Sequence, residues 1–201
     1  MQEFFHQFIS QVTATSWLEA VAVLFGLLSV WYSKQENILV YPTGIIGVVI
    51  AVYLTLRAGL YAEAGINTYY FIMSVYGWYY WTHADPNKPQ VPVTASTKQE
   101  HWIAAGITLG AFVLIRFGLD FTDSDVPNLD AITTATAITG MWLMAKKKLE
   151  NWVYWIITDL IATPLYFYKG LYFFSFQFLV FTALAIWGYV SWRKSLLASA
   201  S

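Results

Sequence analysis

Seven long apolar runs, separated by short polar stretches, dominate the hydrophobic pattern of this chain. Each run is close to the ~20 residues that an α-helix needs to cross the hydrocarbon core of a bilayer. The runs cover residues 17–33, 38–57, 60–81, 102–119, 127–145, 151–168 and 170–192. Most connectors are only a few residues long, so neighbouring helices are predicted to be antiparallel. The longer, proline-rich loop around Pro86–Lys98 indicates a boundary in the organisation of the chain.

The composition supports an all-α integral membrane protein. Of the 201 residues, 58% are hydrophobic and only 11% are charged, whereas a soluble domain has about 25% charged residues. Lipid must therefore cover much of the surface. The net charge of −1 gives no support to a nucleic-acid partner. The chain has no cysteine, so disulfides and thiolate ligands are excluded. The first ten residues lack a basic region and a cleavage site, and a removable signal peptide is not expected.

The distribution of basic residues predicts the orientation in the membrane. With seven spans the termini lie on opposite sides, and 8 of the 11 Lys and Arg residues fall on the side of the C-terminus. Arg57, Arg116 and Lys169 fall on the other side. Basic loops are typically cytoplasmic. The C-terminus is therefore predicted to be cytoplasmic and the N-terminus to lie outside.

An internal repeat is indicated by matches at one spacing. Four matches lie 111 residues apart: the triplet GLY at 59–61 and 170–172, Gly77 and Gly188, Trp81 and Trp192, and Trp31 and Trp142. The pair EN at 36–37 recurs at 150–151, at a spacing of 114. This difference is interpreted as a short insertion that is removed again within the next helix.

The repeat predicts a three-plus-one-plus-three organisation. Residues 1–82 form the first three-helix repeat, 83–126 the loop and linker helix four, and 127–201 the second three-helix repeat. An odd number of linking helices makes corresponding helices run in the same direction. This is a parallel repeat about an axis along the membrane normal, in which substrates bind near the midplane between the halves.

One carboxylate lies deep in a predicted span. Asp159 is near the middle of span 151–168, where an acid costs roughly 2.5–3.5 kcal/mol on insertion scales. Trp152, Trp155, Asp159, Ala162 and Tyr166 follow the three-or-four spacing of one helical face. Intramembrane ionisable groups usually mark a pathway or a ligand counter-charge. We therefore predict that this face contacts the substrate.

Two amides are also predicted to lie at depth. Asn67 is seven residues beyond Leu60, and Gln177 is seven residues beyond Gly170. These spans correspond in the repeat, so the two amides are expected at similar depth on opposite halves.

Enzymatic chemistry is not supported by the motifs. The sequence lacks H-E-x-x-H, G-x-S-x-G and G-x-x-x-x-G-K-[ST]. His6, His83 and His101 are scattered in terminal or loop segments. Aspartyl chemistry needs a second carboxylate near Asp159, and no other span has one at the midplane. We expect neither an enzyme nor a metal or cofactor site.

The stretches NWVYWIITD, YGWYYW and ENILVYPTGIIG resemble the PnuC family of bacterial nicotinamide riboside transporters. The W-x-x-W-x-x-x-D pattern is Trp152, Trp155 and Asp159, and the resemblance covers about 17–193. It implies a SWEET-like fold of seven helices in the bacterial inner membrane, facilitated diffusion of the vitamin precursor, and trapping by cytosolic phosphorylation. It also implies homo-oligomers such as trimers.

The residues fit this substrate. Nicotinamide riboside carries a cationic pyridinium, which can stack on Trp155 and be neutralised by Asp159. The amides can bond the carboxamide or the sugar. No Lys or Arg lies at midplane depth to receive a phosphate, so the mononucleotide is expected to be rejected. The candidate substrate-binding residues are Asn67, Phe71, Trp152, Trp155, Thr158, Asp159 and Gln177.

Two alternatives remain open at this point. Thiamine is also an aromatic cation, and relatives with this fold carry other vitamins, so the fold does not fix the substrate. A proton-coupled carrier is the second alternative, because a buried carboxylate can titrate.

Overall fold

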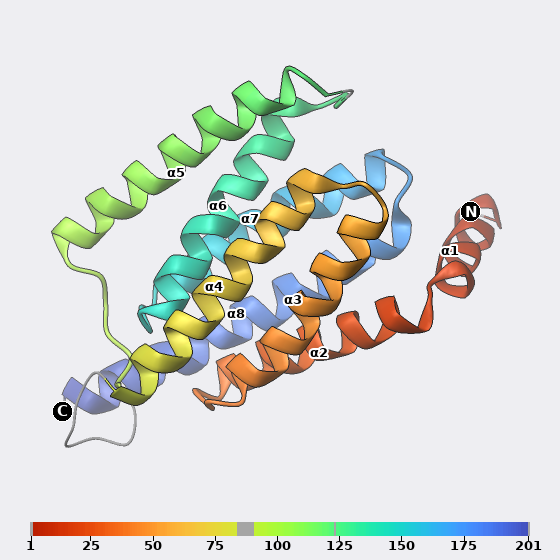
Figure 1. Cartoon of the computed structure of the whole chain (residues 1–201). Coiled ribbons are helices and arrows are strands. Elements are labelled where there is room, and N and C mark those ends of the chain that lie inside the picture. Colours follow the sequence, from red (N-terminus) through yellow and green to blue (C-terminus); the bar gives the residue numbers. More distant parts are fainter. Residues whose placement is uncertain (1, 84–90, 123, 201) are drawn as a thin grey trace. The chain divides into compact units, whose positions relative to one another are not determined.

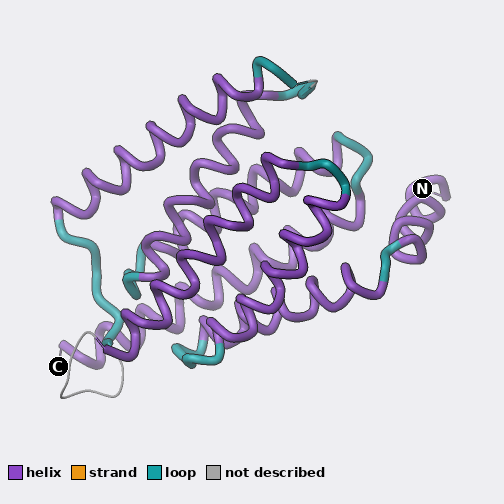
Figure 2. The backbone as a smooth tube through the Cα atoms, viewed as in Figure 1, coloured by secondary structure: helices purple, strands orange, loops and turns teal. Residues whose placement is uncertain are grey.

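The computed structural model describes residues 2–83, 91–122 and 124–200, and these form eight helices (Figure 1). The helices are α1 (Gln2–Ala14), α2 (Trp17–Lys34), α3 (Val40–Arg57), α4 (Tyr61–His83), α5 (Lys98–Leu119), α6 (Pro127–Ala145), α7 (Asn151–Tyr168) and α8 (Tyr172–Ala200). The tube in Figure 2 shows short loops that join α1 to α2, α2 to α3, α3 to α4, α6 to α7 and α7 to α8. Each of the seven predicted apolar runs is a helix, so these elements are confirmed.

The chain divides into two compact units, Met1–Pro92 and Val93–Ser201. In the first unit α2 packs on α3 and α3 packs on α4. In the second unit α5, α6, α7 and α8 pack in chain order, each on the next. Helix α5, expected from sequence as the linker helix four within 83–126, is part of the second unit.

The structure differs from the predicted runs at α1 and at the start of α5. Helix α1 was not predicted, because its 13 residues contain no long apolar run. Helix α5 begins at Lys98, before the apolar run at 102, because Thr97 and Glu100 form a reciprocal capping box. The Thr97 hydroxyl accepts from the Glu100 N–H, and the Glu100 carboxylate accepts from the Thr97 N–H. Such a box satisfies two N–H groups that a helix start leaves without partners.

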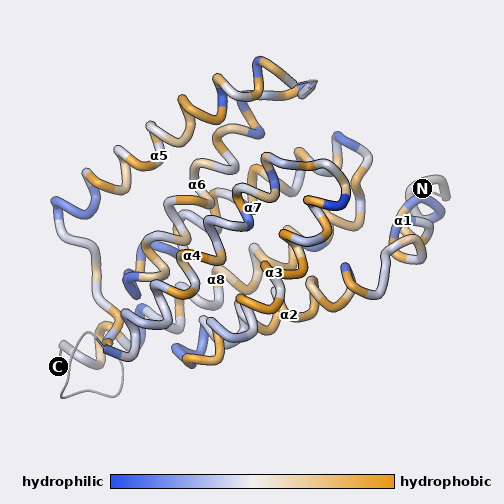
Figure 3. Tube along the Cα trace, viewed as in Figure 1, coloured by the Kyte–Doolittle hydropathy of each residue, from blue (hydrophilic) through white to orange (hydrophobic). Residues whose placement is uncertain are grey.

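Four of the described helices are long and apolar enough to cross a membrane: α2, α3, α5 and α8. The chain is therefore a multi-pass membrane protein. Figure 3 shows the most hydrophilic residues mainly near helix ends. Helices α6 and α7 each lie between two other helices, and small and hydroxyl residues are among those that they bury. Small and hydroxyl residues let membrane helices approach closely and hydrogen-bond across the contact.

The two units repeat the same turns at a constant spacing of 111 residues. The turn after α2 has a positive φ at Glu36 (56°), and the turn after α6 has one at Lys147 (55°). The turns after α3 and α7 have positive φ at Gly59 (75°) and Gly170 (73°), where glycine avoids the strain that a Cβ would add. Lys147 thus holds the position of Glu36. The EN recurrence at a spacing of 114 has no structural counterpart, and its interpretation as an insertion was wrong.

Each unit also repeats a close contact between an aromatic ring and a glycine. In the first unit Tyr41 lies against Gly77 and meets Trp81 edge-to-face, with ring centroids 5.2 Å apart. In the second unit Trp152 lies against Gly188 and meets Trp192 edge-to-face, with centroids 5.5 Å apart. All three positions are related by the spacing of 111. Glycine is required in both helices because the ring occupies the space of a side chain.

The start of α5 is fastened to the loop between α6 and α7. Thr94 pairs with Lys148 in a parallel bridge, in which the Leu149 N–H donates to the Thr94 carbonyl at 2.9 Å. Ser96 donates from its N–H and its hydroxyl to the Glu150 carboxylate, at 2.9 and 2.7 Å. Lys148 forms a partly buried ion pair with Glu100 at 2.9 Å. These contacts fasten the N-terminal end of α5 to the second unit.

A hydrogen bond between threonine hydroxyls joins the middle of α5 to α6. Thr108 Oγ1 and Thr139 Oγ1 are 2.8 Å apart, and Thr139 is fully buried. We expect a Thr108→Val, Thr139→Val double-mutant cycle to give a coupling free energy of about 0.6 kcal/mol, as is usual for such bonds in membranes. Thermal unfolding in detergent measures it. Thr133→Val is the control, because its hydroxyl bonds only the Leu129 carbonyl of its own helix. No coupling above the error would show that the pair does not fix α5.

Candidate substrate-binding site

The carboxylate of Asp159 is buried without a compensating partner. Asp159 is the ninth of the 18 residues of α7, and the residue is 4% exposed. Its backbone carbonyl accepts from the Thr163 hydroxyl at 2.8 Å. Within the described part of the chain, the carboxylate itself has neither an ion-pair nor a hydrogen-bond partner. Such an acid is costly in a membrane unless a ligand or water offsets its charge.

Trp155 lies one helical turn before Asp159, and its ring is placed by a glycine of α6. A Cβ at Gly140 would lie 3.3 Å from the Trp155 ring and 3.3 Å from Tyr154 Cβ. The side chain is half-buried. The missing side chain at Gly140 therefore lets the indole lie close to the α6 backbone. Gly140 was not predicted as a site residue. The small residues that surround it in the sequence of α6 were the pattern that could have indicated a close helix contact there.

Thr158 uses its hydroxyl to join α7 to α6. Thr158 Oγ1 donates to the Tyr154 carbonyl at 2.9 Å and lies 2.8 Å from Thr136 Oγ1. A threonine hydroxyl has one proton to donate, so further substrate contacts of Thr158 are limited to accepting a hydrogen bond. The contact with Thr136 joins α7 to α6 at the residue before Asp159.

Trp152 lies in the packing core between α7 and α8. It is 2% exposed, and its ring fills the space beside Gly188. Its indole N–H is buried and has no acceptor among the residues described. Trp152 and Asp159 are thus on the buried side of the same helix, as the spacing predicts, but the Trp152 ring is already covered by α8.

The predicted amides differ in their surroundings. Gln177 of α8 is half-buried, and its Oε1 has no donor within the described ranges. Asn67 of α4 donates from Nδ2 to the Glu63 carbonyl at 2.8 Å and is half-buried. The two amides do not occupy equivalent positions of the repeat: the position 111 residues after Asn67 is residue 178, one beyond Gln177. One helical residue changes depth by 1.5 Å and direction by ~100°.

Phe71 follows Asn67 by one turn on α4, and its side chain is 36% exposed. Asn67 and Phe71 belong to the first unit, whereas the other five candidates belong to the second. The structure therefore places Trp152, Trp155, Thr158, Asp159 and Gln177 in one unit of packed helices.

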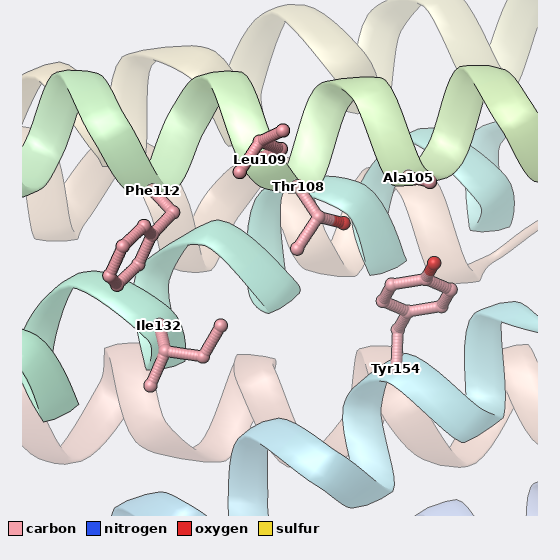
Figure 4. A pocket seen from close by; sticks show the side chains of 6 residues that line it. All are labelled: Ala105, Thr108, Leu109, Phe112, Ile132 and Tyr154. Atoms are coloured by element: carbon pink, nitrogen blue, oxygen red, sulfur yellow. The ribbon is translucent and has the colours of Figure 1, made fainter.

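The described cavities do not include Asp159. A groove of about 350 Å³ lies between α5, α6 and α7 (Figure 4), and a cavity of about 530 Å³ lies at the α7–α8 hairpin. The groove is lined by Ala105, Thr108, Leu109, Phe112, Ile132 and Tyr154. The sequence reading missed both. In the described ranges no three His, Asp or Glu side chains are grouped to hold a metal ion.

A multi-pass membrane protein with a buried acid beside a tryptophan has features typical of a small-molecule transporter, since ionisable groups inside a membrane often mark substrate pathways. The chain belongs to the nicotinamide mononucleotide transporter family, whose model matches residues 16–194. The resemblance inferred from the sequence motifs is thereby confirmed, and the family is one of transporters, not of enzymes.

Similar proteins include transporters of two vitamins. The nicotinamide riboside transporter PnuC of Escherichia coli is 24% identical, over 90% of this chain and 86% of its own length. The riboflavin/roseoflavin transporter RibM of Streptomyces davaonensis is 22% identical, over 88% of this chain and 84% of its own length. The crystal structure of the vitamin B3 transporter PnuC has a TM-score of 0.72 at 21% identity, covering 97% of this chain and 90% of that one. The fold is therefore that of PnuC.

Proposed function

We propose that this protein carries nicotinamide riboside across a bacterial inner membrane by facilitated diffusion, with phosphorylation in the cytosol trapping the substrate. The observation that carries the proposal is the unpartnered carboxylate of Asp159 one turn from Trp155. A pyridinium cation supplies the positive counter-charge that this carboxylate lacks in the described part of the chain. Its aromatic ring gains roughly 0.5–2 kcal/mol over an indole face.

The remaining candidates have distinct proposed roles. Gln177 Oε1 needs a donor, and a carboxamide N–H or a ribose hydroxyl provides one. Asn67 and Phe71 of α4 contribute a polar and an aromatic contact from the first repeat. Thr158 and Trp152 hold α7 in position, and Thr158 has acceptor capacity left for the substrate.

The architecture of the proposed carrier has seven spans. Helices α4, α6 and α7 cross the membrane together with the four more apolar helices, and α1 precedes the first span. The two three-helix repeats, within 1–82 and 127–201, form a parallel SWEET-like pair joined through 83–126. The equal turns and equal aromatic–glycine contacts at a spacing of 111 support this pairing. In the proposed orientation the N-terminus lies outside and the C-terminus lies in the cytoplasm. Transport proceeds by alternating access, and the protein is a homo-oligomer such as a trimer.

Uptake into proteoliposomes tests the substrate. We expect labelled nicotinamide riboside to equilibrate and unlabelled nicotinamide riboside to compete, while the mononucleotide competes at least tenfold more weakly. The described Lys and Arg residues lie in loops or toward helix ends, and Arg193 and Lys194 of α8 follow the predicted span 170–192, so a phosphate group would enter the site without a counter-charge. Stronger competition by riboflavin or thiamine than by nicotinamide riboside would overturn the choice of substrate.

Riboflavin is the second candidate, because the similarity to RibM nearly equals that to PnuC. Riboflavin is uncharged, so a riboflavin carrier would not need the Asp159 carboxylate.

Proton coupling is the remaining alternative for the mechanism. Uptake driven beyond equilibrium by an imposed pH gradient would replace facilitated diffusion with proton-coupled transport.

A further inference from the structure

The cavity at the α7–α8 hairpin has an aromatic lining. Its volume is about 530 Å³, and it is lined by Thr163, Pro164, Phe167, Tyr168, Tyr172 and Ser175. Phe167 and Tyr172 meet at an angle of 66° with ring centroids 5.1 Å apart, so they form two adjoining walls. Tyr168 is 73% exposed and Phe167 is 54% exposed. Three aromatic rings at an accessible cavity are typical of sites for organic cations.

The matching hairpin of the first unit contains its own cation. At the spacing of 111, Arg57 corresponds to Tyr168, and Tyr53 corresponds to Pro164. The Arg57 guanidinium lies over the Tyr53 ring, 5.9 Å from the centroid. Tyr61 and Tyr172 are tyrosines in both units. The first unit thus supplies an arginine where the second unit has an aromatic residue and an open cavity.

The local backbone charge also favours a cation. The cavity lies at the C-terminal end of α7, the negative end of its helix dipole. Pro164 has no N–H, so the Leu160 carbonyl loses its usual donor within the helix. The nearby Lys169 is held by Asp130, with Nζ at 2.7 and 2.9 Å from the two carboxylate oxygens. Its charge is therefore neutralised at the α6 terminus.

We propose that this cavity is a second binding site, for a small aromatic cation. It lies at the C-terminal end of α7, which faces outside in the proposed orientation, so a substrate entering from outside would reach it before Asp159. Thr163 connects the two sites, because it lines the cavity and its hydroxyl bonds the Asp159 carbonyl. Four residues along a helix span about 6 Å. The lining residue Thr163 is thus one helical turn from Asp159 along α7. The identity of the cation as the transported substrate rests on the proposed function, but the preference for a cation does not.

The test uses a pair of probes that differ in charge. Saturation-transfer NMR is recorded with 1-methylnicotinamide, a pyridinium cation, and with neutral nicotinamide, on detergent-solubilised Asp159→Asn protein. This background removes the proposed central site. We expect a signal at least threefold stronger for the cation, and we expect Tyr168→Arg to reduce it to the level of nicotinamide. Tyr168→Phe keeps the ring and is expected to keep most of the signal.

Two further measurements complete the test. Tyr172→Leu removes a different wall and is expected to weaken the cation signal about threefold or more. Equal signals from the two probes, or an unchanged cation signal in both Tyr168→Arg and Tyr172→Leu, would overturn the proposal. The central site is tested separately: normal nicotinamide riboside uptake by Asp159→Asn alone would contradict the proposed function, while the comparison at Tyr168 would still decide the second site.

Discussion

Replacement of Asp159 by asparagine is expected to weaken substrate binding at least tenfold and, at the same time, to stabilise the folded protein. The side chain is buried and its carboxylate has no partner in the described part of the chain. Asparagine keeps the shape but removes the charge that we propose neutralises a pyridinium. The carboxylate can also accept from a ribose hydroxyl, and a hydrogen bond to a charged group contributes about 1.5–3 kcal/mol, which corresponds to roughly 10- to 150-fold in affinity.

The stabilisation follows from the same burial. Removing an unpaired charge from a buried position in a membrane protein relieves its desolvation cost, so we expect a gain of about 1–3 kcal/mol in the free energy of unfolding. Calorimetric titration with nicotinamide riboside measures the first effect, and thermal unfolding without substrate measures the second. Trp155→Ala is expected to weaken binding without the gain in stability.

Asp130→Asn is the matched control. Asp130 is ion-paired to Lys169 and accepts from Ser124, so its replacement is expected to leave binding unchanged and to lower stability slightly. If Asp159→Asn binds normally and is less stable, Asp159 is a structural residue and the proposed site is misplaced.

Replacement of Gly188 by alanine is expected to destabilise the protein by about 1–3 kcal/mol, the usual cost of overpacking a core. A Cβ at this position would lie 2.5 Å from the Trp152 ring, which is held between Gly188 and Trp192 and cannot move away. The equivalent Gly77→Ala is expected to have a similar effect, because its Cβ would overlap Tyr41. Thermal unfolding of the two variants in detergent checks both values.

Gly110→Ala is the control for this comparison. Nothing lies within 4 Å of a Cβ at Gly110 of α5, and alanine favours a helix by about 0.8–1 kcal/mol over glycine. We therefore expect a neutral or stabilising effect. Equal stability of Gly188→Ala and Gly110→Ala would show that the aromatic–glycine contact is looser than the structure indicates.

The helices of this protein could be predicted from sequence because lipid imposes a simple requirement. A span must be apolar over about 20 residues, and polar connectors then mark its ends. Boundaries that depend on local hydrogen bonds were less predictable. Helix α5 begins early because of the Thr97–Glu100 capping box, and α1 lacks the long apolar run that defined the other helices.

The candidate site was predictable only in part. Helical spacing placed Trp152, Trp155 and Asp159 on one side of α7; in the structure Trp152 and Asp159 are buried, whereas Trp155 is half-buried against α6. Spacing alone did not reveal that Trp152 packs under α8, because this depends on Gly188, 36 residues later. Nor did it show that the Thr158 hydroxyl is bonded to Thr136.

The sequence by itself determined the class of protein, the seven helices with long apolar runs and the repeat of 111 residues, because hydrophobicity and recurring residues are properties of the chain. The tertiary structure decided which polar groups are already satisfied and which are left without partners. That distinction depends on the neighbouring helix: Gly140 admits the Trp155 ring and Thr136 pairs with Thr158, whereas no described side chain pairs with Asp159. A buried charge without a partner is costly, and we therefore propose that the substrate binds there.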